Sequence, residues 1–133
     1  MDGMLEQLVR QRAANKCEYC CLPQRFSRLT FPIDHIVARQ HGGATTESNL
    51  ALACPFCNCH KGPNIAGMDP ETNQMTRLFH PRSDAWAEHF RWNGSLIVGL
   101  TAVARTTIAV LVINHPAQTA IRNTLIDEGE FPE

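Results

Sequence analysis

Two cysteine pairs with identical spacing constrain the fold of this 133-residue chain more than any other feature: Cys17-Glu-Tyr-Cys20 and Cys54-Pro-Phe-Cys57. A two-residue spacer lets both sulfurs of a pair face the same ion, and two such pairs supply the four thiolates of a tetrahedral structural zinc site. We therefore expect one structural Zn²⁺ to be bound by Cys17, Cys20, Cys54 and Cys57. Buried reduced thiols or a redox-active pair are the alternatives, although a redox role would need only one pair.

The N-terminal segment, residues 1–17, is polar and helix-forming, and it has no apolar stretch of the kind found in secretion signals. We therefore expect a cytoplasmic protein, in which thiols stay reduced and bind metal rather than form disulfides. Residues 96–113 reach the length of a membrane span, but Arg105 in their middle favours a place in the protein core and no membrane partner. Cys21 and Cys59 are left without an assigned role.

The two cysteine pairs are separated by 33 residues, from Cys21 to Ala53. Simple zinc ribbons place about 15–20 residues between their pairs, so the zinc site alone does not need so long an insert. The insert should therefore carry a function of its own. It contains Asp34-His35-Ile36-Val37, Gly42-Gly43 and Asn49-Leu50, and Asn58-Cys59-His60-Lys61 follows directly after the second pair.

In this order and with this spacing, the motifs resemble the HNH endonuclease family, and the resemblance covers about residues 13–66. Members of that family have a ββα-metal core that is often enclosed by two such cysteine pairs. The resemblance implies metal-dependent hydrolysis of phosphodiester bonds in nucleic acid. Asn58 stands where the last histidine of the family name stands, so the chain looks like an Asp-His/Asn/Asn variant of the pattern.

Phosphodiester hydrolysis requires an activated water and stabilisation of charge on the phosphoryl oxygens. A neutral imidazole can accept a proton from water near pH 7, so His35 is the expected general base. Asp34 and Asn58 would hold one divalent cation through oxygen atoms, and Mg²⁺ or Mn²⁺ suits such ligands better than softer ions do. The resemblance implies that Asn49 fixes the loop that presents His35.

Two further residues after the second cysteine pair, His60 and Lys61, are expected to contact the substrate. The alternatives are a surface role for each and, for His60, zinc binding in place of a cysteine. One difficulty concerns the proposed catalytic pair. Adjacent side chains on a strand point to opposite faces, so Asp34 and His35 can serve one site only where the strand bends or ends.

Hydrophobic periodicity and turn residues predict the secondary structure in outline. We expect helices over residues 4–15, 58 to about 66 and 117–128, strands over 31–39 and 50–53, a loop over 68–82, a hairpin around Asn93-Gly94, and either a helix or a strand over 102–113, with the helix favoured. The predicted fold class is α+β. Residues 1–68 would form a small zinc-clamped HNH core with an N-terminal helix, and residues 69–133 a C-terminal hairpin and helical extension packed on it.

The formal net charge is −1, which argues against a protein that binds nucleic acid purely by electrostatic attraction. The segment 1–62 contains seven Lys and Arg residues and five Asp and Glu residues, and it is the more basic half of the chain. We interpret the chain as a small bacterial metal-dependent HNH endonuclease, with DNA favoured over RNA as the substrate. The alternative is a non-catalytic zinc-binding module for nucleic acid or protein, and a dimer stays open.

Overall fold

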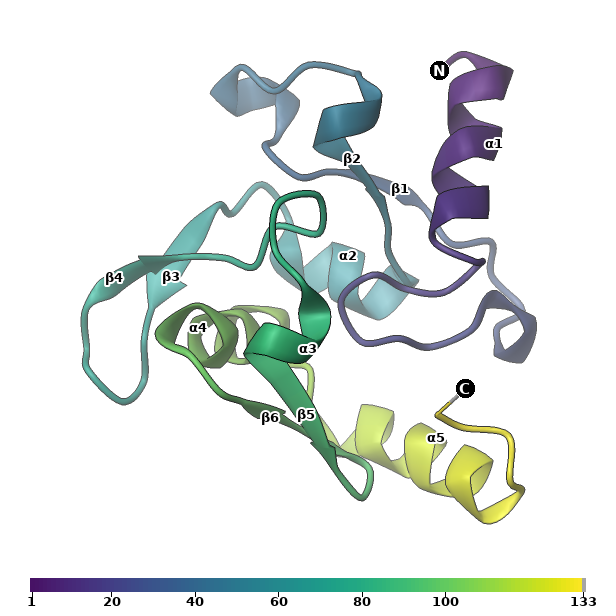
Figure 1. Cartoon of the computed structure of the whole chain (residues 1–133), viewed down its shortest axis with the longest axis vertical. Helices are drawn as coiled ribbons and strands as arrows, with labels where there is room; N and C mark the ends of the chain where they lie inside the picture. The colour runs from purple at the N-terminus through teal and green to yellow at the C-terminus, as the bar shows by residue number, and fades with distance from the viewer. Residues whose placement is uncertain (133) are drawn as a thin grey trace.

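The computed structural model describes residues 1–132, and in this part of the chain it has five α-helices and three two-stranded antiparallel sheets (Figure 1). Glu133, the last residue of the expected C-terminal extension, lies outside the described residues. The elements are α1 (Gly3–Arg12), β1 (Ile33–His35), β2 (Leu50–Leu52), α2 (Pro55–Lys61), β3 (Ala66–Met68), β4 (Met75–Arg77), α3 (Trp86–His89), β5 (Phe90–Asn93), β6 (Leu96–Gly99), α4 (Ala102–Leu111) and α5 (Pro116–Asp127), with 3₁₀ turns at Gln24–Phe26, Arg39–His41 and Glu47–Asn49.

The predicted α+β class and the ββα core are confirmed. Strands β1 and β2 pair antiparallel, with Asp34 opposite Ala51, and α2 follows β2 after two residues (Figure 1). The predicted strand over 31–39 is shorter than expected, because the chain leaves the ladder after His35 and enters the loop that leads to the 3₁₀ turn at Arg39–His41.

Helix α2 begins three residues before the predicted start at 58 and ends at Lys61. Cys54 caps its N-terminus, since its sulfur accepts the Cys57 N–H, and Pro55 occupies the first helical position, which it favours. Gly62 ends the helix with a positive φ of 50°, a conformation that glycine adopts without steric cost. The second cysteine pair therefore forms the first turn of a helix rather than a separate turn.

The C-terminal half contains one element that we expected to be a loop. Strands β3 and β4 form a hairpin within residues 66–77, where a loop over 68–82 was expected. Asp69 holds its turn by accepting hydrogen bonds from Glu71 N–H and the Thr72 hydroxyl, and Arg105 binds the same carboxylate with two nitrogens. The three-residue strands are too short to show periodicity, and their anchor lies 36 residues away, so local sequence did not indicate them.

The remaining secondary-structure predictions for the C-terminal half are confirmed. Gly94 (φ 61°) turns the β5–β6 hairpin, residues 102–111 form a helix, and α5 ends just before Gly129 (φ 74°). Helix α4 packs against α2, β6 and the β3–β4 hairpin. That hairpin spans the expected boundary at residue 68. Within residues 1–132, none of the helices is both long and apolar enough to cross a membrane.

The buried apolar side chains form one cluster that draws on both halves of the chain. It includes Val9 of α1, Phe31 before β1, Leu50 of β2, Phe90 of β5 and Leu111 of α4. Because the four paired cysteines belong to the same cluster, the predicted zinc site lies inside the core rather than at its edge.

Candidate active site and metal centre

The four paired cysteines converge in the structure. The sulfur atoms of Cys17, Cys20, Cys54 and Cys57 all lie within 4.8 Å of one another, and all four residues are buried. The backbone N–H groups of Cys20 and Cys57 donate to the sulfurs of Cys17 and Cys54, at 3.5 and 3.4 Å. Hydrogen bonds from the other three thiols hold the pKa of Cys54 well below its usual range. Four converging sulfurs form the donor set of a structural zinc site.

The two remaining cysteines lie outside this cluster. Cys59 is exposed on α2, and Cys21 is half-buried, directly after the first pair. Burial and the nearby Cys17 raise the pKa of the Cys21 thiol to about 12, so this group is a thiol at neutral pH. The two-residue spacing therefore identifies the converging set correctly.

Asp34, His35 and Asn58 line one open hollow of about 290 Å³, together with Arg39. The first two residues come from the end of β1 and Asn58 from the middle of α2, so the antiparallel pair and the following helix bring them together. The difficulty of two adjacent side chains on one strand is removed because β1 ends at His35. Asp34 is buried, whereas His35 is half-buried.

The Asp34 carboxylate is held by two partners. Its Oδ2 atom accepts a hydrogen bond from the Tyr19 hydroxyl at 2.8 Å and lies 3.0 Å from the Lys61 ammonium, which is 3.3 Å from Oδ1. Burial raises the pKa of Asp34, and the charge of Lys61 opposes that shift. Burial and the neighbouring carboxylate also raise the pKa of Tyr19 well above its ordinary value, so Tyr19 remains a neutral donor.

Lys61 does not fit the substrate contact expected from the sequence. Its side chain is only 1% exposed, and its ammonium also donates to the backbone carbonyls of His35 and Ile36, at 3.3 and 3.1 Å. The helix turns Lys61 toward β1, where a buried ammonium requires the carboxylate and carbonyl oxygens that surround it. Lys61 therefore stabilises the end of β1 from within.

His60 lies apart from the hollow. It is exposed, its ring stacks on Phe56 with a centroid distance of 4.1 Å, and its Nδ1 atom is 2.9 Å from the Phe56 carbonyl oxygen. Among the described residues that line the hollow, His60 is absent. The helical turn places it on the outer face of α2, away from Asp34 and His35.

Asn49 closes the loop that follows β1. Its side-chain oxygen accepts the Val37 N–H at 2.9 Å, and its amide nitrogen donates to the carbonyls of Val37 and Ala44, at 3.0 and 2.9 Å. Gly43 makes this closure possible, because a Cβ atom there would lie 1.7 Å from the Val37 carbonyl oxygen. Within the same loop, the Thr45 hydroxyl lies 2.9 Å from Nε2 of His35 and orients the ring.

Sequence reasoning missed two of these contributors, Tyr19 and Thr45. The available signal for Tyr19 was its position, since the single tyrosine of the chain lies between the two members of a cysteine pair. Thr45 carried no local signal. Two arginines close to the site in sequence differ in their surroundings: Arg39 lines the hollow, whereas Arg25 pairs with Glu130.

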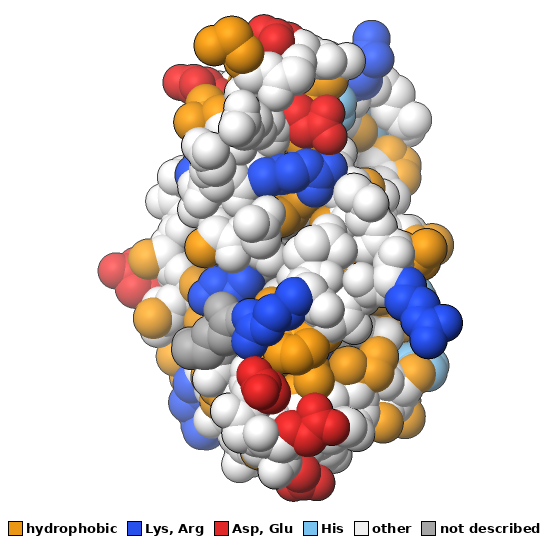
Figure 2. Space-filling view, turned by 90° about the vertical axis from the view of Figure 1, so that its right-hand side faces the viewer, with side chains coloured by type: hydrophobic (Ala, Val, Ile, Leu, Met, Phe, Trp, Pro, Cys, Tyr) orange, Lys and Arg blue, Asp and Glu red, His pale blue; other side chains and the backbone are white. Residues whose placement is uncertain are grey.

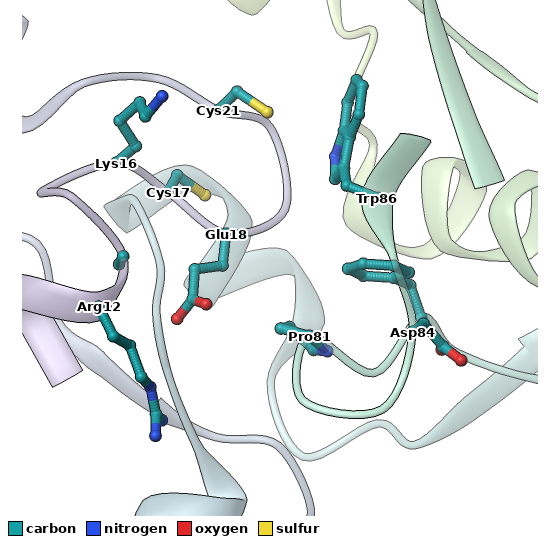
Figure 3. A pocket seen from close by; sticks show the side chains of 10 residues that line it. Arg12, Lys16, Cys17, Glu18, Cys21, Pro81, Asp84 and Trp86 are labelled. Carbon is teal, nitrogen blue, oxygen red and sulfur yellow. The ribbon is translucent and has the colours of Figure 1, made fainter. Parts of the chain in front are cut away.

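A second hollow, of about 220 Å³, separates the first cysteine turn (residues 17–20) from residues 79–86 (Figure 3). Two polar contacts bridge these segments beside it. Trp86 Nε1 donates to the Tyr19 carbonyl at 2.9 Å, and Arg82 forms an ion pair with Glu18. The C-terminal half therefore contacts the first cysteine turn directly.

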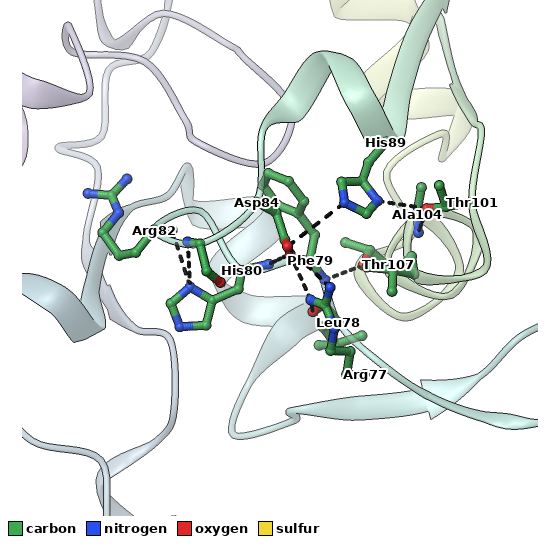
Figure 4. A network of polar contacts seen from close by, with 12 residues as sticks. Arg77, Leu78, Phe79, His80, Arg82, Asp84, His89, Thr101, Ala104 and Thr107 are labelled. Carbon is green, nitrogen blue, oxygen red and sulfur yellow. Dashed lines mark hydrogen bonds and ion pairs between the residues drawn. The ribbon is translucent and has the colours of Figure 1, made fainter.

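The segment that makes these contacts is itself anchored by a polar network (Figure 4). Asp84 accepts two hydrogen bonds from Arg77, at 2.7 and 3.1 Å, and one from the His80 N–H at 2.9 Å. These hydrogen bonds, those from Arg77 foremost, hold the pKa of Asp84 below its usual range. Phe79 N–H donates to Thr107 of α4 at 2.8 Å, which ties the segment to the C-terminal helices.

Comparison with protein-family models identifies an HNH endonuclease domain over residues 17–64. Comparisons with curated proteins and with solved structures gave no significant match. The matched range begins at Cys17 and includes β1 and β2, the loop closed by Asn49 and the whole of α2. Residues 17–64 of this chain therefore match the model of the HNH endonuclease domain, a family whose members are in general nucleases.

Proposed function

We propose that this protein is a metal-dependent endonuclease that hydrolyses phosphodiester bonds in nucleic acid, with DNA as the favoured substrate. The observation that carries the proposal is the convergence of Asp34, His35 and Asn58 on one open hollow inside an HNH-family domain. Each residue alone is compatible with a structural role. Together they supply a base and two oxygen ligands within the same space.

Asp34 and Asn58 would hold a divalent cation through a carboxylate and an amide oxygen. Both are hard oxygen donors of the kind that Mg²⁺ and Mn²⁺ prefer, and the open hollow leaves room for water and phosphate. When bound, the cation would stabilise negative charge on the phosphoryl oxygens. In the same way, the convergent cysteines would hold Zn²⁺ as a structural ion.

His35 would act as the general base. Its imidazole takes a proton from the attacking water, while Thr45 and the loop closed by Asn49 keep the ring oriented. The water oxygen forms the new bond to phosphorus and the bond to one sugar oxygen breaks. That oxygen then takes a proton, which leaves one phosphate end and one hydroxyl end. Arg39 is exposed at the hollow and would contact a phosphate of the substrate.

The formal net charge of −1 supports a substrate held mainly at the site rather than along a basic surface. On the described part of the face that carries α1 and α5, Lys and Arg side chains form separate groups among acidic and apolar ones (Figure 2). Affinity for nucleic acid would then be weak and salt-sensitive. One active site cuts one strand, so cleavage of both strands would require a second copy or a second encounter.

The cellular setting is part of the same proposal. Four free thiols arranged for zinc are favoured in a reducing compartment, which supports a cytoplasmic protein. We further propose that residues 1–68 act as the catalytic unit, with the C-terminal extension packed against it.

A plasmid nicking assay tests this proposal. Supercoiled DNA is incubated with wild type, His35→Ala and His41→Ala in the presence of Mg²⁺, Mn²⁺ or a chelator. We expect wild type and His41→Ala to nick, since His41 is exposed and six residues from His35, and we expect His35→Ala to lose at least about 100-fold in rate. Equal rates for wild type and His35→Ala would reject His35 as the base. Binding of DNA without any nicking would instead support the non-catalytic module.

A further inference from the structure

One tyrosine links the cysteine cluster to the candidate active site. Tyr19 lies between Cys17 and Cys20, is 1% exposed, and donates its hydroxyl proton to Asp34 Oδ2 at 2.8 Å. The same residue receives a hydrogen bond from Trp86 on its carbonyl oxygen, and its ring meets the ring of Phe79 edge-on at 6.5 Å. Three separate parts of the chain therefore meet at Tyr19.

We propose that Tyr19 is a positioning residue, which orients the Asp34 carboxylate for the divalent cation and so couples the cysteine cluster and the C-terminal segment to that site. The inference rests on the proposed function, because it assigns Asp34 as a cation ligand. It goes beyond that function by giving the two halves of the chain a shared effect on cation affinity.

The first argument is the rigidity of the segment that carries Tyr19. The neighbouring Glu18 N–H donates to the Leu52 carbonyl at 2.8 Å, and the Glu18 carboxylate accepts the Leu52 N–H at 2.8 Å. Arg82 pairs with the other oxygen of that carboxylate. Since the first cysteine turn is bonded both to β2 and to residues 79–86, the Tyr19 hydroxyl occupies a defined position beside β1.

The second argument is that the two Asp34 oxygens have different sets of partners. Tyr19 and Lys61 both approach Oδ2, at 2.8 and 3.0 Å, whereas Oδ1 has the longer contact of 3.3 Å to Lys61. An ionised carboxylate accepts about four hydrogen bonds or metal contacts in total. With two partners on Oδ2, Oδ1 keeps more of its accepting capacity, and a cation held by Asp34 would use it. Without the tyrosine hydroxyl, Lys61 alone would hold the carboxylate and would not define its rotation.

The third argument is chemical precedent for such an arrangement. Groups that bond to a metal ligand from behind orient it, and their loss typically reduces metal affinity or activity about 10–100-fold. Tyr19 meets this description, because its hydroxyl contacts the expected ligand Asp34 and its ring is buried in the core.

Tyr19→Phe tests the inference, because it removes one oxygen atom and keeps the buried ring. The matched control is Thr106→Val, which removes a buried hydroxyl on α4 that has no hydrogen-bond partner within residues 1–132. For each purified full-length protein we would measure zinc content, melting temperature, Mn²⁺ affinity from the electron paramagnetic resonance signal of free Mn²⁺, and nicking rate over a range of Mn²⁺ concentrations. Asn58→Ala should lose the Mn²⁺ ion bound at the candidate site, so comparison with wild type identifies that ion.

We expect Tyr19→Phe to keep one zinc ion per chain and to weaken Mn²⁺ binding about 10-fold. Nicking should fall at low Mn²⁺ and recover largely at high Mn²⁺, while Thr106→Val matches wild type. Mn²⁺ affinity of Tyr19→Phe within twofold of wild type would overturn the inference, and so would loss of zinc, which would indicate a structural role. If wild type binds Mn²⁺ at the Asn58-dependent site but His35→Ala nicks equally, the assignment of the base fails and the inference stands.

Discussion

Lys61 and Asp34 form an ion pair across the ββα core, with Nζ 3.0 Å from Oδ2 and side chains that are 1% and 6% exposed. The pair joins the last residue of α2 to the middle of β1, and the same ammonium binds the two carbonyls that follow. A lysine in this position replaces part of the solvation that the buried carboxylate loses. It therefore stabilises the strand end at which both Asp34 and His35 enter the hollow.

Replacing Lys61 should lower the free energy of unfolding of the domain. Lys61→Met leaves a buried carboxylate without its cation, and removal of one partner of a buried pair costs about 3–5 kcal/mol. Urea unfolding followed by circular dichroism measures the loss. Arg91→Met is the control, because Arg91 is exposed on β5 and its replacement should change stability by less than about 0.5 kcal/mol. Similar stabilities for the two variants would show that the ion pair contributes little.

The cysteine cluster predicts that zinc is required for folding. Cys57→Ser removes a buried member of the cluster, whereas Cys59→Ser changes an exposed thiol two residues further along the same helix. A structural zinc ion contributes directly to folding free energy, so Cys57→Ser should lose zinc and melt at a lower temperature. Cys59→Ser should retain one zinc ion per chain and the wild-type melting curve. Plasma mass spectrometry measures the zinc content of each variant, and thermal melts measure its melting temperature. A zinc-loaded Cys57→Ser protein would contradict the prediction.

Gly43 should not tolerate even one methyl group. A Cβ atom at this position would lie 1.7 Å from the Val37 carbonyl oxygen and 2.9 Å from the Asn49 amide nitrogen, so the backbone of the loop must shift. Gly43→Ala should lower stability by about 1–3 kcal/mol, as overpacking does, and should reduce nicking because the loop orients His35. Gly3→Ala meets open space and should lower neither property. Wild-type nicking by Gly43→Ala would show that the loop accommodates the shift.

Acid should weaken the polar network around Asp84 that anchors the C-terminal segment. The folded-state pKa of Asp84 is lowered, chiefly by hydrogen bonds from Arg77, so its stabilising contribution is present above the unfolded-state pKa of about 3.9 and is lost as the pH falls through the folded-state value. Urea unfolding between pH 7 and pH 3 should show a smaller loss of stability for Asp84→Asn than for wild type. Asp127→Asn, at an exposed carboxylate, should follow the wild-type curve. If the stability of Asp84→Asn fell with pH as steeply as that of wild type, this carboxylate would be excluded as a source of the acid sensitivity.

The features that could be predicted from the sequence share one physical property, which is that neighbouring residues determine them. The two cysteine pairs, the Asn93-Gly94 turn and the helix ended by Gly129 follow from local spacing and backbone preference. The order of Asp34-His35, Asn49 and Asn58 also pointed to three residues that line the hollow and to Asn49, which closes the loop after β1, although it did not indicate their partners.

Tertiary structure alone decided the contacts between distant segments. The β3–β4 hairpin depends on Arg105, the inward direction of Lys61 depends on the position of Asp34 across the core, and the environment of Asp34 depends on Tyr19. No local sequence pattern indicates any of these pairs, because each forms only when packing brings the two side chains together. The sequence by itself therefore determined which residues have side chains suited to metal binding or proton transfer, and the fold decided which of them are held in position, since burial and orientation are properties of the packed chain.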